Sequence, residues 1–308
     1  MLRSSTRQKI SVAITLFACF AYDFSVRAEK RLSVEFVLEA MKARAAQLTS
    51  GDLSYSSRNL ANPKTSHQLD FIFITDGRRA MGRCVMEKSW RWGFDGKTFC
   101  SLREDTSQAN LKDSIPEKCM PTMIDPRYFN DLEPRLTTYL LRHQDRVTLN
   151  QPKGETNVIT LDIEVPKEDL ETAFLGWPRA CSEGAHVTIW VKLSEGFELI
   201  KQEMRGGAKA PYEGILGSTI TWSNWVKRDP GVWLPTAVEV QVYGVKDQGK
   251  SPITDMLYSF DKVNLTKKFT DGDFRLAVPA GYTVHDVRGG TQFTYVSHGG
   301  FPALREPK

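Results

Sequence analysis

Residues 159–165 read Ile-Thr-Leu-Asp-Ile-Glu-Val, and their strict alternation of apolar and polar side chains decides the fold class. In an extended chain this order places every apolar side chain on one face and every polar one on the other. The same period of two recurs at 187–193 and at 238–242. Strands with one apolar face are typical of antiparallel sheets buried on one side. Turn signals such as Asp95-Gly96 separate these strands at short intervals, which favours sequential hairpins.

One helix is predicted ahead of the strands, from about Ser33 to Leu48. Its apolar residues recur at the spacing of one helical face: Val34, Val37, Leu38, Met41, Ala45 and Leu48. Ser33 is a suitable N-cap, and Glu35 places a favourable charge in the first turn. The polar face mixes acidic and basic residues without the basic excess of a membrane-surface helix. We therefore expect the helix to pack on the sheet.

Two stretches interrupt the alternation of the strands. Residues 101–134 are polar and rich in proline, and they lead into a short predicted helix. The residues on one face of that helix are Leu136, Tyr139, Leu140 and His143. Residues 166–184 form a second irregular segment. Both stretches are expected to be loops on the surface of the sheet.

The first residues have the pattern of a secretory signal peptide. Arg3, Arg7 and Lys9 precede an apolar run at 10–20, which is shorter than the roughly 20 residues needed to span a bilayer. A small-residue cleavage site predicts processing after Ala28. The mature chain is therefore expected to be periplasmic or secreted.

Residues 16–19, Leu-Phe-Ala-Cys, allow a second form of processing. They resemble a bacterial lipobox, in which Cys19 would carry a lipid anchor, although the phenylalanine is bulkier than that pattern usually has. We favour cleavage as a signal peptide of residues 1–28. One domain is then predicted over 29–297, followed by a polar tail at 298–308.

The charge of the chain belongs largely to this leader. The formal net charge is +4, and residues 1–28 carry four basic residues and one acidic residue, so the mature chain is left at +1. A nearly neutral chain offers no basic surface for nucleic acid. Its composition is that of an ordinary globular protein, with 41% hydrophobic and 25% charged residues.

Four cysteines follow the leader: Cys84, Cys100, Cys119 and Cys181. An even number of cysteines in an exported chain suggests disulfides, with three possible connectivities. A hairpin centred at Asp95-Gly96 would place Cys100 opposite Arg91 and not opposite Cys84. The connectivity therefore stays open.

No motif indicates catalysis or a bound metal. The five histidines lack a metal-ligand spacing such as H-E-x-x-H, and no serine lies in G-x-S-x-G. Asp271-Gly272-Asp273 is too short for a calcium loop and is typical of a turn. We expect a non-catalytic protein without a cofactor. A hydrolase assembled from distant strands is a less favoured alternative.

The order of these elements resembles the superfamily of periplasmic lipoprotein carriers that includes LolA, LolB, RseB and LppX. The resemblance covers most of residues 30–288 as an architecture. Its short motifs are Val232-Trp233-Leu234-Pro235 within a strand pair and three stretches that look like the closing strands of LolA-like proteins: Asp261-Lys262-Val263-Asn264-Leu265, 273–276 and 279–286.

This resemblance implies an α+β fold that is mainly antiparallel: a half-open barrel of about ten strands. The N-terminal helix and the short mid-chain helix would cover its concave face and enclose an apolar cavity. Such a cavity would hold lipid or the acyl chains of a lipoprotein, and the protein is expected to be a monomer. The implied lid residues are Val37, Leu38 and Met41. The implied cavity residues are Phe71, Phe73, Leu161, Ile163, Ile189, Val191, Trp222, Val238 and Val240.

Two alternatives accompany that assignment. Apolar stripes on strands fill a dry core by default, and the protein would then be an envelope interaction or sensor module that binds a protein through the loops at 101–134 and 166–184. Trp222 and Trp225 are equally compatible with a cavity mouth and with the outer face of the sheet.

Overall fold

The structure is a computed structural model, and it describes residues 32–60, 62, 66–74, 79–85, 90–114, 132, 134–174, 177–194, 196–208 and 212–302. In 66–74 and 79–85 only the backbone is described. The predicted signal peptide, its cleavage site, Cys19 and Cys119 lie outside these residues. No helix in the described part of the chain is both long enough and apolar enough to cross a membrane.

One open sheet organises the molecule. Within the described residues it has fifteen strands in the order β15-β14-β6-β5-β4-β3-β2-β1-β13-β12-β11-β10-β9-β8-β7. The strands are β1 (Ser50–Asn59), β2 (Ser66–Ile74), β3 (Arg79–Val85), β4 (Trp90–Asp95), β5 (Phe99–Arg103), β6 (Gln108–Lys112), β7 (Thr148–Asn150), β8 (Val158–Pro166), β9 (Gly184–Lys192), β10 (Glu198–Gly206), β11 (Leu216–Arg228), β12 (Val232–Tyr243), β13 (Pro252–Asn264), β14 (Thr283–Asp286) and β15 (Phe293–Val296).

The sheet is antiparallel except where β14 pairs parallel with β6, and its two edges, β15 and β7, do not pair with each other. The predicted class, α+β with an incomplete barrel, is confirmed. The number of strands exceeds the predicted ten because β5, β6, β7, β14 and β15 have only three to five residues each. Strands this short display too few alternations to be located from the sequence alone. The closing strand expected at 273–276 is wrong, because Asp271–Phe274 is a 3₁₀ turn, and of 279–286 only Thr283–Asp286 forms a strand.

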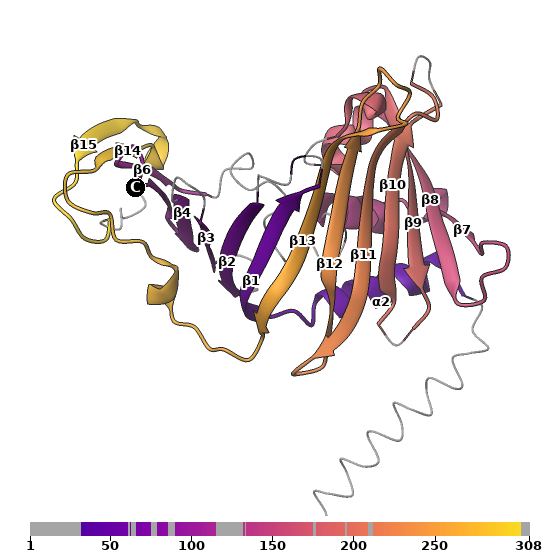
Figure 1. The fold of residues 1–308 in the computed structure, drawn as a ribbon, viewed down its shortest axis with the longest axis horizontal. Coiled ribbons are helices and arrows are strands. Elements are labelled where there is room, and N and C mark those ends of the chain that lie inside the picture. Colours follow the sequence, from indigo (N-terminus) through magenta and orange to yellow (C-terminus); the bar gives the residue numbers. More distant parts are fainter. Residues whose placement is uncertain are drawn as a thin grey trace, which may run out of the picture.

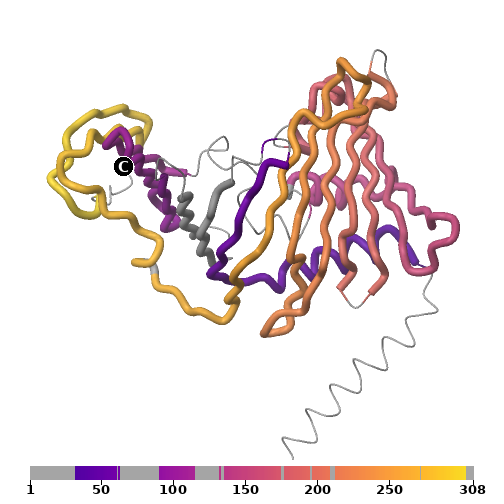
Figure 2. The backbone as a smooth tube through the Cα atoms, viewed as in Figure 1, coloured from indigo at the N-terminus to yellow at the C-terminus, as the bar shows by residue number. Residues whose placement is uncertain are grey.

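Figure 1 shows that the sheet has a broad half, made of β1 and β7–β13, and a narrow half, made of β2–β6 with β14 and β15. The helix α2 (Val34–Ala45) crosses the concave face of the broad half. After β13 the chain returns along the foot of the sheet to the narrow half (Figure 2). The other helices are α3 (Pro134–Arg142), α4 (Leu170–Ala173) and the 3₁₀ turns η2 (Gln144–Arg146), η3 (Lys167–Asp169), η4 (Arg179–Cys181), η5 (Asp271–Phe274) and η6 (Arg288–Gly290).

The two predicted helices are present. Ser33 caps α2, and its Oγ accepts a hydrogen bond from the Phe36 backbone N–H at 3.2 Å. On α3, Leu136, Tyr139 and Leu140 are buried, as the predicted face requires. The predicted loop at 166–184 contains η3, α4 and η4. The predicted loop at 101–134 is wrong for its first part, because 101–103 belong to β5 and 108–112 are β6.

The N-cap of α2 allows a direct test. Replacing Ser33 by alanine removes the side-chain acceptor for the first turn, and we expect a loss of about 1 kcal/mol in the free energy of unfolding. Urea titration would measure it. The control is Ser114→Ala, at an exposed serine, which should change stability by less than about 0.5 kcal/mol. Equal effects in the two variants would show that the cap contributes nothing.

Two hydrophobic clusters lie on opposite faces of the sheet. The large cluster fills the concave side, between α2, α3, α4 and the inner faces of the strands. The small one is formed by Cys100, Leu102, Ala109, Leu111, Leu276, Val278 and Val284. It forms where the C-terminal segment folds over β5 and β6. Gly300, within the predicted tail, pairs there with Val278.

The predicted disulfides do not form at two of the four cysteines. Cys100 and Cys181 are free, buried thiols, and they lie in different hydrophobic clusters. Burial raises the pKa of each thiol to about 12. The hairpin between β4 and β5 turns later than predicted, so Cys100 lies opposite Gly93. Cys84 lies opposite Trp90, and its side chain is outside the described residues.

Candidate functional site

The candidate site is the apolar interior between the concave face and the helices. Seven of the nine predicted cavity residues have described side chains, and all seven are 0–5% exposed and belong to the large cluster. They are Leu161, Ile163, Ile189, Val191, Trp222, Val238 and Val240. For Phe71 and Phe73 only the register is known: they lie opposite Leu53 and Gly51.

The predicted lid residues join the same cluster. Val37, Leu38 and Met41 are at most 2% exposed and pack with the inner faces of the strands. This interior is therefore filled with side chains in the structure. A small cavity of about 10 Å³ among the described residues lies elsewhere, between β4, β5 and η5.

Contacts at the rim hold α2 in place. Arg44 is buried, and its Nη1 donates to the carbonyl oxygens of Gly196 and Phe197 in the turn between β9 and β10. Its guanidinium lies 5.0 Å from the centre of the Trp225 ring. Nearer the start of the helix, the Phe36 ring meets that of Phe197 edge to face at 5.7 Å. Any opening of α2 must break these contacts.

The helices α3 and α4 close the end of the interior next to β8. The Tyr139 hydroxyl donates to Asp169 Oδ2 at 2.8 Å, and Arg135 donates to the Glu171 carbonyl at 2.8 Å. Burial and this hydrogen bond to Asp169 raise the pKa of Tyr139 to about 12. By contrast, the inner face near β11, β13 and β1 includes apolar residues that are only partly buried: Ile220, Met256, Phe260 and Val263. The interior is therefore incompletely covered on this side by the described residues.

Trp222 and Trp225 were equally compatible with a cavity mouth and with the outer face of the sheet, and the backbone between them distinguishes the two positions. Asn224 has a φ of 54°, the left-handed conformation that asparagine tolerates better than most residues. This conformation interrupts the alternation, and both rings pack with the large cluster although they are three residues apart. Neither tryptophan covers the outer face.

Gln202 is a buried polar residue of the inner face that was not predicted from the sequence. It is 6% exposed, and in the register it lies between Ile189 on β9 and Ile220 on β11. A signal for it was present, since Gln202 and Met204 alternate with the charged residues 201, 203 and 205. Tyr55 and Tyr258 also line this interior and were not predicted.

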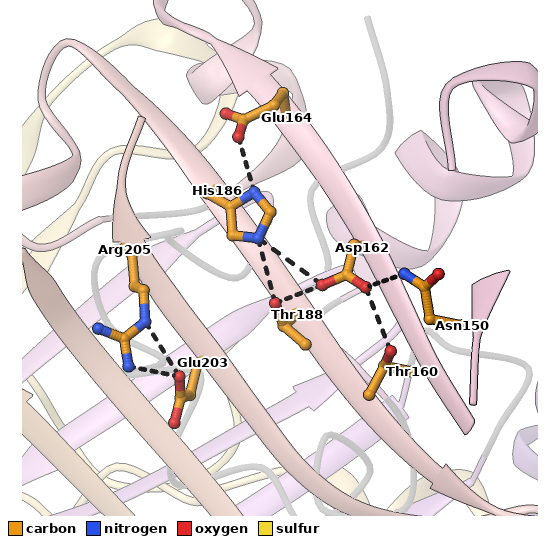
Figure 3. Close-up of polar contacts among 8 residues, drawn as sticks. All are labelled: Asn150, Thr160, Asp162, Glu164, His186, Thr188, Glu203 and Arg205. Atoms are coloured by element: carbon orange, nitrogen blue, oxygen red, sulfur yellow. Dashed lines mark hydrogen bonds and ion pairs between the residues drawn. The ribbon is translucent and has the colours of Figure 1, made fainter. Parts of the chain in front are cut away.

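The outer face of β7–β10 carries a polar network (Figure 3). His186 Nδ1 lies 2.7 Å from Glu164 Oε1, and its Nε2 lies 3.3 Å from Thr188 Oγ1. This order resembles a hydroxyl-histidine-carboxylate triad. However, the Thr188 hydroxyl donates to Asp162 Oδ1 at 2.6 Å, so its proton is directed away from the imidazole. Asn150 and Thr160 also donate to Asp162, at 3.0 and 3.2 Å.

The network is better explained as the solvated side of the sheet. Its side chains alternate with the buried Leu161, Ile163, Val187 and Ile189 on the same strands. In the described part of the chain, no group of three or more histidine, cysteine, aspartate or glutamate side chains is arranged to hold a metal ion.

Glu203 on this face predicts a pH dependence of stability. Burial of the carboxyl alone would raise its pKa, but hydrogen bonds from Lys201 and Arg205 and their charges hold the pKa of Glu203 below its usual 4.5. A depressed pKa stabilises the fold above the unfolded value, and the contribution is lost as the pH falls through the folded value.

Replacing Glu203 by glutamine should therefore lower the free energy of unfolding by about 1 kcal/mol at neutral pH, and by less below pH 4. Urea titrations at pH 7 and pH 3.5 would measure the difference. The control, Glu171→Gln, alters an exposed carboxyl. A loss that is the same at both pH values would contradict the assignment.

Comparisons with known proteins found similar chains among solved structures only. No protein-family model matches the sequence, and no curated protein matches it. A LolA superfamily protein from Nitrosomonas europaea is similar, with 12% identity over 79% of this chain and 97% of that chain, at a TM-score of 0.48. A putative outer membrane lipoprotein-sorting protein domain from Vibrio parahaemolyticus has 13% identity over 79% and 97%, at 0.45.

The lipoprotein LppX of Mycobacterium tuberculosis is also similar, with 11% identity over 77% of this chain and 98% of that chain, at a TM-score of 0.32. The likeness concerns the arrangement of the chain and says nothing of a ligand.

Proposed function

We propose that this protein is a non-catalytic carrier that holds lipid, or the acyl chains of a lipoprotein, in the apolar interior of its half-open barrel. The observation that supports this most is how the interior is closed. The two edges of the sheet do not meet, and helices that contact the strands through apolar side chains cover the concave face instead. Apolar groups of a ligand can take the place of these helical side chains without breaking the hydrogen bonds between the strands.

The energy available for such an exchange is large. Each methylene transferred from water to an apolar interior contributes about 0.8 kcal/mol, so a sixteen-carbon chain gains on the order of 10 kcal/mol. The cost includes the Arg44 hydrogen bonds to Gly196 and Phe197, at about 1 kcal/mol each, and the contacts of α2 with the strands. We therefore propose that acyl chains enter beside α2, near the partly buried Ile220 and Met256, and that release follows the return of the helix.

A second candidate rests on a specific observation. The described candidate residues are at most 5% exposed, as they would be in a permanently filled core. In that case the protein would be an interaction or sensor module of the cell envelope that recognises a protein partner. The two functions differ in whether an acyl ligand enters the interior.

We propose that the protein acts outside the cytoplasm. The leader at residues 1–28 would direct export, and cleavage after Ala28 would release a periplasmic or secreted monomer. Processing at Cys19 would instead anchor the same domain to a membrane as an acceptor.

Hydrogen exchange with and without palmitate tests the proposed entry. Delipidated protein should bind about one palmitate per chain, and amides of α2, Val34–Ala45, should exchange faster in the complex because the helix is displaced. Amides of β12 serve as the internal control and should keep their protection. A protein that binds no palmitate, with unchanged exchange in α2, would favour the filled interaction module.

A further inference from the structure

We infer that the inner wall of β10 and β11 holds a recognition point for the carbonyl oxygen of an ester-linked acyl chain, formed by the Trp222 indole N–H and the Gln202 side-chain amide. This inference rests on the proposed function, and it adds the chemistry of the head of the ligand. Both residues lie on the inner face of the broad half, on neighbouring strands.

Trp222 carries the main observation. It is 4% exposed, and its ring packs in the large cluster opposite Val238. Its Nε1 is buried and has no hydrogen-bond partner in the part of the chain that the structure describes. Trp225 differs, because its Nε1 donates to the Leu199 carbonyl at 2.9 Å. Buried N–H groups almost always have an acceptor, so the Trp222 donor indicates an acceptor that arrives with a ligand.

Gln202 supplies the second donor. Its side chain is more than nine-tenths buried, and no hydrogen bond joins its amide to another described residue. The register places Gln202 opposite Ile220 and therefore diagonal to Trp222 on the same face of the sheet, a spacing of about 7 to 8 Å between Cα atoms. Side chains of this length can reach a common atom between them.

The character of these donors selects the ligand. An indole N–H and a carboxamide are neutral, and their inner-face neighbours Ile220, Val238 and Val240 are uncharged. A carboxylate or phosphate placed at this point would have no compensating cation among these neighbours. Arg44 lies beside Trp225 at the rim, and a free fatty acid can leave its carboxylate there. An ester carbonyl needs only one or two donors and is followed directly by an acyl chain, which matches the apolar residues around it. The partly buried Ile220 and Met256 lie on this side of the interior, where the ligand is proposed to enter.

The test compares 1-monoolein with its alkyl ether analogue, which has the same chain and glycerol head but no carbonyl. Competition against a fluorescent fatty acid gives both affinities. The wild-type protein should bind the ester about 5- to 10-fold more tightly than the ether. Trp222→Phe removes the N–H and keeps an aromatic ring, so it should reduce the ester affinity to that of the ether and leave the ether affinity unchanged.

Controls separate this inference from a structural effect. Trp190→Phe makes the same change on the outer face, where Lys201 lies 5.2 Å from the ring centre, and should alter neither affinity. Gln202→Met repeats the test at the second donor if Trp222→Phe does not fold. Equal binding of ester and ether by the wild type, or an equal loss of both in Trp222→Phe, would overturn the recognition point but leave acyl binding intact. A wild type that binds neither lipid would overturn the proposed function as well.

Discussion

Replacing Asp286 by asparagine is expected to lower the free energy of unfolding by about 3 to 5 kcal/mol, because it removes the carboxylate that pairs with a buried guanidinium. Asp286 and Arg288 are 2% and 4% exposed. The Arg288 Nη2 and Nε donate to the two carboxylate oxygens at 2.8 and 3.0 Å. These hydrogen bonds raise the pKa of Arg288 further above its usual value.

The Asp286–Arg288 pair lies where the C-terminal segment joins the sheet, so the loss of stability in Asp286→Asn should be concentrated there. Asp286 ends β14, the strand that pairs parallel with β6, and Gly289 in the turn that follows donates to Asp113 at 2.6 Å. Loosening this region should expose the small cluster that contains Cys100. Urea titration would give the stability, and a thiol reagent would report the exposure.

Two comparisons accompany this prediction. In Asp286→Asn, Cys100 should react before Cys181, which lies in the other cluster and serves as the internal control. The double variant Asp286→Leu with Arg288→Met should lose less stability than the single one, since no charge is left unpaired. A single variant that loses under 1 kcal/mol would show that the pair does not hold the C-terminal segment in place.

Replacing Leu161 by alanine should be about as costly, at about 2 to 5 kcal/mol, because its side chain is completely buried on the inner face of β8. It lies between Leu149 and Ile189 in the register of three strands, so the surroundings have little freedom to close the cavity. The control is Val226→Ala on β11, at a side chain that is 38% exposed, where the change should stay below about 0.5 kcal/mol.

The ligand adds a second expectation for Leu161→Ala. A carrier is stabilised by whatever binds its folded state, so saturating monoolein should raise the stability of both the wild type and the variant. The variant should gain at least as much, since the cavity enlarges the space for an acyl chain. An unchanged urea midpoint in both proteins with added lipid would indicate a core that admits no ligand.

Elements that bury one face could be predicted from the sequence, and elements without this pattern could not. The helix at Val34–Ala45 and the strands around 159–165 and 187–193 were predicted because each buries one face, and one buried face imposes a period. The strand β5 was expected only as the second strand of the hairpin at Asp95-Gly96, and its end at 101–103 was assigned to a loop. Phe99, Cys100, Ser101 and Leu102 are all buried, so no alternation marks the length of this strand. The pairing of β14 with β6 joins residues 175 positions apart, and a sequence gives no local sign of it.

The burial of the candidate residues was predictable from the sequence, but their use was not. Leu161, Ile189 and Val238 are buried as the alternation required, but apolar residues give the same pattern whether they fill a core or line a cavity. Trp222 and Trp225 share the inner face only because of the backbone conformation at Asn224. The missing acceptor for Trp222 is visible only once the side chains are packed.

Native mass spectrometry of the protein purified from its own cell envelope, followed by lipid extraction, tests the carrier function most directly. We expect one ester-linked lipid or lipoprotein per chain. The intact mass of the polypeptide should be that of a chain that begins at Glu29. A protein that is recovered without lipid, and that remains empty after incubation with monoolein, would contradict the carrier function.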